Sequence, residues 1–347
     1  MLKLGIIGAT GYVGAEIVRL LALRDDIRIT TVVSNSFVGK PFSAVYPSLR
    51  GIYDNICDEL DIEALSEKAD FFITALPHGV STSVIPSLLA KGKRVIDHSG
   101  DFRFRDVKIY EKWYKVTHGA PDFISKAVYG LPEIYRNEIK TASLVADPGC
   151  YPTCSVLGIA PALKSGIVSH QDIIISAASG VSGAGRKSDL PYAFCETDEN
   201  FKAYGIANHR HTPEIEQELS LLCGKPVLVS FTPHLAPLKR GMLATSYLDL
   251  IDGKLSPDDI HSLYVDHYRN EPFVRILPVG QLPETKYVAG SNYIDIGITV
   301  DTRLKKLIVV SALDNLGKGS ASQAIQALNI MAGFNETKGL LSPGLYL

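Results

Sequence analysis

Residues 2–14 read LKLGIIGATGYVG and decide the fold. They combine a short apolar strand with a G-x-x-G-x-x-G turn, and a helix with one apolar side is expected over residues 15–23. Strand, glycine turn and helix in this order are typical of a dinucleotide-binding unit. Side chains at Gly8 or Gly11 would keep a pyrophosphate away from the amides of the helix N-terminus. A tight strand-to-helix turn without a ligand is the alternative.

A second strand, predicted over residues 29–33, ends at Ser34, Asn35 and Ser36. This is about 20 residues beyond the glycine turn, where NAD-binding chains place an acidic residue on the ribose 2′-hydroxyl. Hydroxyl and amide groups stand here instead, with Lys40 close behind. They favour a 2′-phosphate, and therefore NADP over NAD, although ordinary loop polarity would explain the same residues.

Further strands are predicted over residues 69–76, 94–97 and 144–147, alternating with helices. This alternation predicts a parallel, doubly wound sheet that binds ligands at the carboxyl ends of its strands. Pro77 and Arg103 follow strands on that edge. His78 and His98 do too, and we expect them to be hydrogen-bonding loop residues rather than catalytic groups.

Residues 146–154 read ADPGCYPTC. Pro152 is suited to the first turn of a helix, where the amides have no intrahelical partner. Cys150 would then lie at the positive end of the helix dipole, which favours a thiolate and makes this residue a candidate nucleophile. A small buried apolar residue is the alternative for Cys150. Cys154, one helical turn later, is expected in the core.

A loop at residues 179–187, SGVSGAGRK, follows a strand predicted over 172–178. Ser182, Gly183 and Arg186, with Lys187 beside them, suit a substrate phosphate or carboxylate. A flexible linker would have a similar composition.

Residues 209–214 read HRHTPE. Thr212 is the predicted N-cap of a helix, with Pro213 at its first position. His209 and His211 precede that helix, and either is placed to exchange protons with a thiol. His-x-His also occurs in metal sites, but the spacing to a third ligand such as His234 does not support one, so no metal is expected.

Four strands dominate the rest, over residues 226–233, 241–248, 293–300 and 306–311. Their short spacings predict an α+β domain with a mixed or antiparallel sheet, which a second subunit could cover. Residues 314–324, DNLGKGSASQA, lead into a helix through Met331, and Asn315 and Gly317 are expected near the nicotinamide. The predicted domains are a dinucleotide-binding domain, 1–149, completed by a C-terminal helix at about 316–347, and a substrate and oligomerisation domain, 150–315.

The composition is typical of a soluble globular protein. The 347 residues are 46% hydrophobic and 21% charged, with a net charge of −2, which gives no sign of nucleic-acid or membrane-surface binding. Apolar runs are far too short for a membrane span, and no secretory signal is recognisable. Five irregularly spaced cysteines do not form a disulfide framework, so a reducing, cytoplasmic setting is expected.

These motifs together resemble the N-acetyl-gamma-glutamyl-phosphate reductase family, type 1, nearly end to end. The resemblance is carried by segments 8–14, 76–81, 99–103, 148–153, 179–186, 209–214 and 314–319. It departs from the family at Cys154, where Gly or Ala is usual, and at Gly100, where Ala is common.

The resemblance implies a glyceraldehyde-3-phosphate-dehydrogenase-like arrangement of the two domains. It also implies NADPH-dependent reduction of an acyl phosphate through a cysteine thioester, in arginine biosynthesis. Cys150 is then the nucleophile, with His209 or His211 as acid and base. The cofactor-binding residues are expected to be Gly8, Thr10, Gly11, Tyr12, Val13, Gly14, Ser34, Asn35, Ser36, Pro77, Asn315 and Gly317, and the substrate-binding residues Ser182, Gly183, Arg186 and Arg103.

Three alternatives remain open from the sequence. Aspartate-semialdehyde dehydrogenase shares the fold and the cysteine chemistry, although the HRHTPE loop and the CYPT motif favour the acetylglutamyl family. A reductase of carrier-bound aminoadipyl phosphate would carry similar motifs. A non-catalytic dinucleotide-binding redox sensor would need the cysteine but not the histidine and anion loops.

Overall fold

The computed structural model describes residues 1–186 and 188–346. Contacts divide the chain into two compact units. The first contains Met1–Pro148 and Ser320–Leu341, and the second contains Gly149–Gly319 together with the residues from Ser342 onward.

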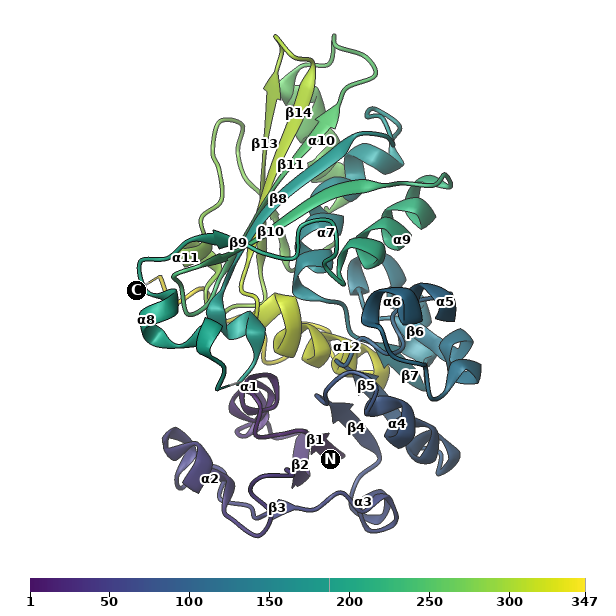
Figure 1. The fold of residues 1–347 in the computed structure, drawn as a ribbon, viewed down its shortest axis with the longest axis vertical. Helices are drawn as coiled ribbons and strands as arrows, with labels where there is room; N and C mark the ends of the chain where they lie inside the picture. The colour runs from purple at the N-terminus through teal and green to yellow at the C-terminus, as the bar shows by residue number, and fades with distance from the viewer. Residues whose placement is uncertain (187, 347) are drawn as a thin grey trace. The chain divides into compact units, whose positions relative to one another are not determined.

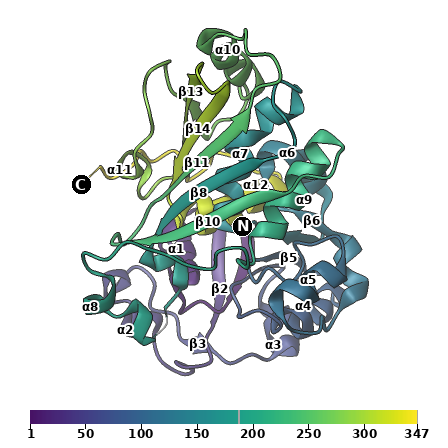
Figure 2. The same ribbon diagram turned by 45° about the horizontal axis from the view of Figure 1, so that its top comes forward.

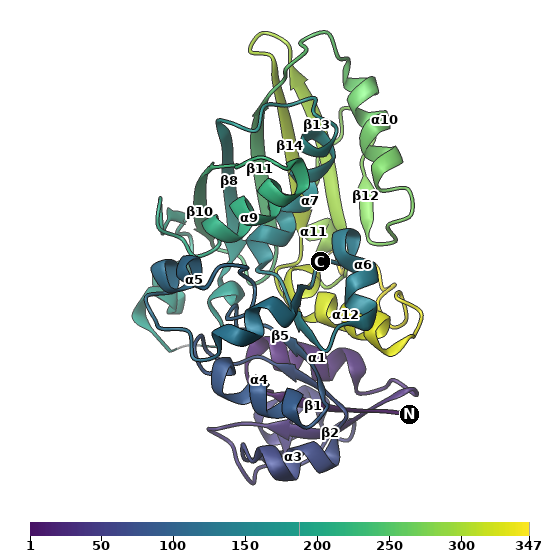
Figure 3. The same ribbon diagram turned by 90° about the vertical axis from the view of Figure 1, so that its right-hand side faces the viewer.

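The first unit is a doubly wound sheet of seven parallel strands, as predicted. Its strand order is β3-β2-β1-β4-β5-β7-β6 (Figure 1). Helices lie on both faces: in Figure 3, α1 and α3 lie on opposite sides of β1 and β2. The strands are β1 Leu2–Ile7, β2 Ile27–Val33, β3 Cys57–Asp58, β4 Phe71–Thr74, β5 Arg94–Asp97, β6 Ala127–Tyr129 and β7 Leu144–Ala146. The helices are α1 Tyr12–Leu21, α2 Phe42–Val45, α3 Ile62–Lys68, α4 Ser81–Ala90, α5 Val107–Tyr114, α6 Pro132–Thr141 and α12 Ser322–Ala332.

The second unit contains a mixed sheet of seven strands, also as predicted. The order is β12-β13-β14-β11-β8-β10-β9, and Figure 2 shows the five longest strands side by side. Parallel pairs join β8 to β10 and β12 to β13, and the other pairs are antiparallel. The strands are β8 Ile173–Gly180, β9 Lys202–Ala203, β10 Val229–Ala236, β11 Met242–Asp249, β12 Val274–Ile276, β13 Ile294–Asp301 and β14 Lys306–Leu313. The helices are α7 Cys150–Lys164, α8 Phe194–Thr197, α9 Thr212–Cys223, α10 Pro257–His267 and α11 Thr285–Val288.

Helix α7 forms the core of the second unit. All thirteen residues from Tyr151 to Leu163 are buried, so the helix is enclosed on every side rather than amphipathic. It contacts β11 and β14 on the sheet and helices α9 and α10. Figure 3 shows α7, α9 and α10 on the same face of the sheet. None of the helices in the described ranges combines the length and apolar character that crossing a membrane requires.

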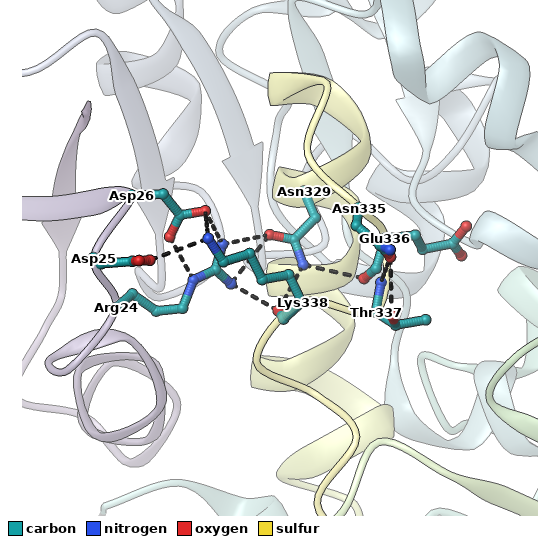
Figure 4. Close-up of polar contacts among 8 residues, drawn as sticks. All are labelled: Arg24, Asp25, Asp26, Asn329, Asn335, Glu336, Thr337 and Lys338. Atoms are coloured by element: carbon teal, nitrogen blue, oxygen red, sulfur yellow. Dashed lines mark hydrogen bonds and ion pairs between the residues drawn. The ribbon is translucent and has the colours of Figure 1, made fainter.

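The C-terminal segment that belongs to the first unit, Ser320–Leu341, is bound by Arg24, which follows α1 (Figure 4). Its guanidinium donates to both carboxylate oxygens of Asp26 at 2.7 Å, to Asn329 Oδ1 at 3.2 and 3.3 Å, and to the carbonyl of Lys338 at 2.7 Å. The Asn329 amide donates to the carbonyls of Glu336 and Lys338. One side chain therefore connects the end of α1 with α12 and the segment after it.

We predict that Arg24→Ala lowers the free energy of unfolding by about 3 kcal/mol, because it removes a guanidinium that is only 6% exposed and leaves the half-buried Asp26 with Lys338 as a weaker partner. Lys338→Ala is the matched control. Its ammonium also pairs with Asp26, at 3.0 Å, but its side chain is 42% exposed, so a loss below about 1 kcal/mol is expected. Denaturant titration measures both, and equal losses in the two variants would contradict the central role of Arg24.

Candidate active site

The glycine turn of the first unit is shaped for close backbone approach. Gly8 has φ +83°, and a Cβ there would lie 2.3 Å from the carbonyl oxygen of Ala75. A Cβ at Gly14 would lie 2.5 Å from Cα of Ala9. At Gly11, the N-cap of α1, a Cβ would meet only the Gly8 carbonyl, at 3.5 Å, and no side chain caps the helix. This uncapped helix start fits a pyrophosphate.

Thr10 and Ser34 connect this turn to the loop after β2. Their hydroxyl oxygens are 2.8 Å apart, and Ser34 is buried. Asn35 and Ser36, the next two residues, are exposed. Ser34 therefore braces the glycine turn, while Asn35 and Ser36 are the accessible polar groups. Contact of all three with a 2′-phosphate stays a prediction.

Buried carboxylates fix the loops after β4 and β5. Asp97 accepts hydrogen bonds from Ser81 at 2.9 Å and from other hydroxyl groups nearby. Both carboxylate oxygens of Asp101 lie 2.9 Å from the amide nitrogen of Gly79. Burial raises the pKa of Asp101 above its usual value. These bonds hold the loop that carries Pro77, which is itself exposed.

Arg103 is buried between the ends of β5 and β7. Its Nε donates to the carbonyl of Asp147 at 2.6 Å and its Nη2 to the carbonyl of His98 at 3.0 Å. His98 Nδ1 lies 3.0 Å from an Asp147 carboxylate oxygen. His98 thus has the hydrogen-bonding place expected of it, whereas substrate contact by Arg103 stays a prediction.

In the second unit, Cys150 is the first residue of α7. Gly149 is the N-cap, again without a side-chain cap. The Gly149 amide donates a hydrogen bond to Glu214 Oε1 at 2.8 Å. Glu214 lies in α9 and is fully buried. Cys150 is partly exposed, whereas Cys154 is fully buried with its Sγ 3.4 Å from the Ser311 carbonyl oxygen. Burial raises the pKa of Cys154 to about 12, which agrees with its predicted place in the core.

The imidazole of His211 lies directly against the backbone of Gly149, the residue before Cys150. A Cβ at Gly149 would lie 2.4 Å from His211 Nε2, so only glycine fits there. The predicted N-cap at Thr212 is wrong. Helix α9 begins at Thr212 itself, His211 precedes it, and no side chain caps it. Close packing of α7 against α9 takes precedence here over a side-chain cap.

His209 is enclosed by rings. Its centroid lies 5.5 Å from those of Tyr151, Tyr204 and Phe231 and 4.8 Å from that of His211. Burial, followed by the charge of Arg210, lowers the pKa of His209 to about 4. Its Nδ1 accepts a hydrogen bond from the His211 amide at 3.1 Å. His209 is therefore neutral near pH 7, and its proton lies on Nε2.

Tyr151 and Tyr204 are site residues that the sequence interpretation missed. The Tyr204 hydroxyl donates to the Tyr151 hydroxyl at 3.2 Å, which in turn donates to the His234 carbonyl at 3.1 Å. Burial raises the pKa of both phenols, that of Tyr204 to about 12, so both stay protonated. The signal was present in the CYPT motif, where Tyr151 adjoins Cys150, the candidate nucleophile. Over the described ranges, no three His, Cys, Asp or Glu side chains are grouped to hold a metal ion.

The predicted anion loop is held by Asn315. The Asn315 Nδ2 donates to Ser182 Oγ at 2.9 Å, and its Oδ1 accepts from the Gly241 amide at 2.8 Å. Gly183 and Arg186 are exposed, and Lys187 lies outside the described residues. The Gly317 amide donates to the Asp314 carboxylate at 3.1 Å. The expected nicotinamide contacts of Asn315 and Gly317 stay predictions.

Comparison with known proteins identifies the family of the chain. Residues 3–142 match the family model of the semialdehyde dehydrogenase NAD binding domain, and residues 150–315 match that of the semialdehyde dehydrogenase dimerisation domain. An N-acetyl-gamma-glutamyl-phosphate reductase of Acetivibrio thermocellus is 60% identical over 347 residues, covering 100% of both chains. This chain belongs to the N-acetyl-gamma-glutamyl-phosphate reductase family. A second member, from Desulforudis audaxviator, is 50% identical over 100% of both chains.

Solved structures outside the reductase family share the fold. Aspartate semialdehyde dehydrogenase II from Vibrio cholerae, complexed with ASA, has a TM-score of 0.73 at 14% identity, covering 96% of this chain and 98% of that one. The Candida albicans aspartate semialdehyde dehydrogenase with NADP has a TM-score of 0.71 at 15% identity, with the same coverages. At these identities the likeness concerns the fold alone.

Proposed function

We propose that the chain catalyses the NADPH-dependent reductive dephosphorylation of N-acetyl-gamma-glutamyl phosphate in arginine biosynthesis. The products are N-acetyl-L-glutamate 5-semialdehyde and phosphate. One observation supports the proposal most strongly, namely the placement of Cys150 as the first residue of the buried helix α7. His211 packs against the preceding Gly149, and Glu214 accepts a hydrogen bond from the Gly149 amide. The names of the close relatives supply the substrate.

Cys150 acts as the nucleophile. Its Sγ forms a bond to the acyl carbon while the bond from that carbon to the phosphate oxygen breaks, which gives a thioester and inorganic phosphate. Bound NADPH supplies the hydride that reduces the thioester carbon. The carbon–sulfur bond then breaks, which releases the aldehyde and restores the Cys150 thiolate. A thiolate suits both steps because it is a good nucleophile and a good leaving group.

The two histidines have different roles in this proposal. His211 takes the proton of the Cys150 thiol and exchanges protons with the substrate oxygen as the thiohemiacetal forms and collapses. His209 cannot cycle through a cationic form near neutral pH, because the surrounding rings keep it neutral. It acts instead as a fixed Nε2–H donor to the reacting oxygen.

The glycine turn and the loop after β2 are proposed to hold NADP. Uncapped amides at the start of α1 would receive the pyrophosphate, and the exposed Asn35 and Ser36 the 2′-phosphate. No acidic residue in that loop would repel the phosphate. Because the nucleophile must remain a reduced thiol, we also propose a cytoplasmic location.

A second copy of the chain is proposed to cover the open face of the second unit's sheet. On this face Ile174 pairs with Tyr247 across β8 and β11, and the two side chains are 46% and 36% exposed. Exposed apolar pairs on a broad sheet favour association. The match to a dimerisation domain supports a homo-oligomer.

The Cys150→Ser variant is expected to lose reductase activity by roughly 10⁴-fold or more, since an alkoxide is neither formed nor released as easily as a thiolate. NADPH binding, followed by fluorescence titration, should survive and stay tighter than NADH binding. Phosphate-dependent NADP reduction with N-acetylglutamate semialdehyde measures the activity. Appreciable turnover by the variant would rule out the thioester route.

A pH profile separates the histidines. His211→Asn should lower kcat by about 10²- to 10⁴-fold, as expected for loss of a general base. It should also remove the acid limb of the kcat/KM profile. His209→Asn, the matched control, keeps a hydrogen-bond donor and should keep that limb, because a group with a pKa of about 4 does not titrate in the working range. Loss of the limb in the His209 variant alone would reverse the assignment.

Light scattering should give the mass of at least two chains. Ile174→Lys on the open sheet face is expected to shift the mass toward one chain, because it would bury unpaired charge in the interface. Leu221→Lys replaces an apolar residue of similar exposure, 42%, on α9 and should leave the mass unchanged. A monomeric wild-type protein would refute this interface.

A further inference from the structure

The carboxylate of Asp314 is a second organising centre of the second unit. Asp314 follows β14 and is fully buried. Its carboxylate accepts hydrogen bonds from the amides of Leu316, at 2.9 Å, and Gly317, at 3.1 Å, and from the amide of Gly290. A buried charge with this many donors holds the chain around it rigidly.

Arg240 is bound to the same carboxylate. It lies between β10 and β11, and its Nε is 2.9 Å from Asp314 Oδ2 and 3.1 Å from Oδ1. Its side chain is 25% exposed, whereas that of Asp314 is fully buried. Because the guanidinium is planar, fixing Nε fixes the direction of the whole group. The ion pair with Asp314 therefore holds the Arg240 guanidinium by its Nε in the interior, while the Arg240 side chain remains partly exposed.

The turn that begins at Asp314 also reaches the nucleophile. The Gly319 amide donates to the Asp314 carbonyl at 2.9 Å, and a Cβ at Gly319 would lie 2.8 Å from Cβ of Cys150. Asn315 connects the same turn to Ser182 of the anion loop and to Gly241, the residue after Arg240. Arg240, Ser182 and Cys150 are thus gathered around one six-residue turn.

We propose that Arg240 binds the α-carboxylate of the substrate and that Asp314 is its positioning residue. The proposal rests on the proposed function, whose substrate carries two anionic groups, a carboxylate and a phosphate. Asp314 balances the charge of Arg240, so the pair has little net positive charge. Its contribution to binding is the fixed orientation of the guanidinium hydrogen-bond donors. This suits a monoanion that stays bound throughout the reaction and is recognised by a planar donor group. The phosphate, which must leave, is assigned to the exposed anion loop with Arg186.

The reverse reaction tests this assignment, because it presents the two anions on separate substrates. N-acetylglutamate semialdehyde carries the carboxylate, and inorganic phosphate is added independently. Arg240→Gln is expected to raise the KM for the aldehyde roughly 10- to 100-fold, the effect of losing charged hydrogen bonds. The KM for phosphate should change little. Arg186→Gln is the matched control and should show the opposite pattern.

A substrate analogue sharpens the result. Wild-type enzyme should prefer N-acetylglutamate semialdehyde over 4-acetamidobutanal, which lacks only the carboxylate, and Arg240→Gln should abolish most of that preference. Asp314→Asn should reduce the same preference, while a purely structural role would lower kcat/KM for both aldehydes equally. Should Arg240→Gln fail to fold, Arg240→Lys, which keeps the charge but not the planar donor set, is expected to raise the aldehyde KM by an intermediate amount.

The failures are distinguishable. No phosphate-dependent oxidation of N-acetylglutamate semialdehyde by the wild-type protein would overturn the proposed function. An active wild type in which the Arg240 variants raise only the phosphate KM, or keep their preference for the carboxylated aldehyde, would overturn the carboxylate assignment alone.

Discussion

The hydrogen bond from the Gly149 amide to Glu214 is the interaction on which the candidate active site of the second unit depends. It fixes the first turn of α7, where Cys150 begins the helix, against the first turn of α9, which follows His211. Glu214 is fully buried, so its carboxylate has no water to replace a lost donor. The requirement for glycine at position 149 has the same origin, since His211 occupies the space of a Cβ. Cys150 and His211 are therefore placed by one helix pair.

Buried carboxylates have the same function elsewhere in the chain. Asp97 ends β5 and Asp101 lies in the loop after it, whereas Asp314 follows β14 in the second unit, and each accepts hydrogen bonds from the segments around it. A loop that carries chemistry cannot be held by a large apolar core, because its backbone must stay near the surface. A desolvated carboxylate with several donors gives such a loop rigidity.

The local parts of this design could be predicted from the sequence. The glycine turn, the parallel sheet, the mixed sheet and the helix start at Cys150 follow from short-range patterns, and the structure has all of them. The pairing of Ser34 with Thr10, of Asn315 with Ser182, and of Asp314 with Arg240 could not be predicted, because each joins residues far apart in sequence. Thr212 shows the limit most clearly. It has the residue type of an N-cap, but α9 begins at Thr212 itself, one residue earlier than predicted, and His211 is the N-cap.

The burial of α7 fixes the position of Cys150, the first residue of this helix. Thirteen consecutive residues of this helix are buried, and Cys150 is the residue at the point where it emerges. Shifting a helix enclosed on every side would open cavities or create overlaps along its whole length. The Cys150 sulfur therefore has a fixed position, and in the proposed function adaptation to the substrate would occur in the surrounding loops. In the proposed assignments, Arg240, which is paired with Asp314, and the exposed loop with Arg186 would bind the two anions of the substrate in different ways, the first fixed and the second adaptable.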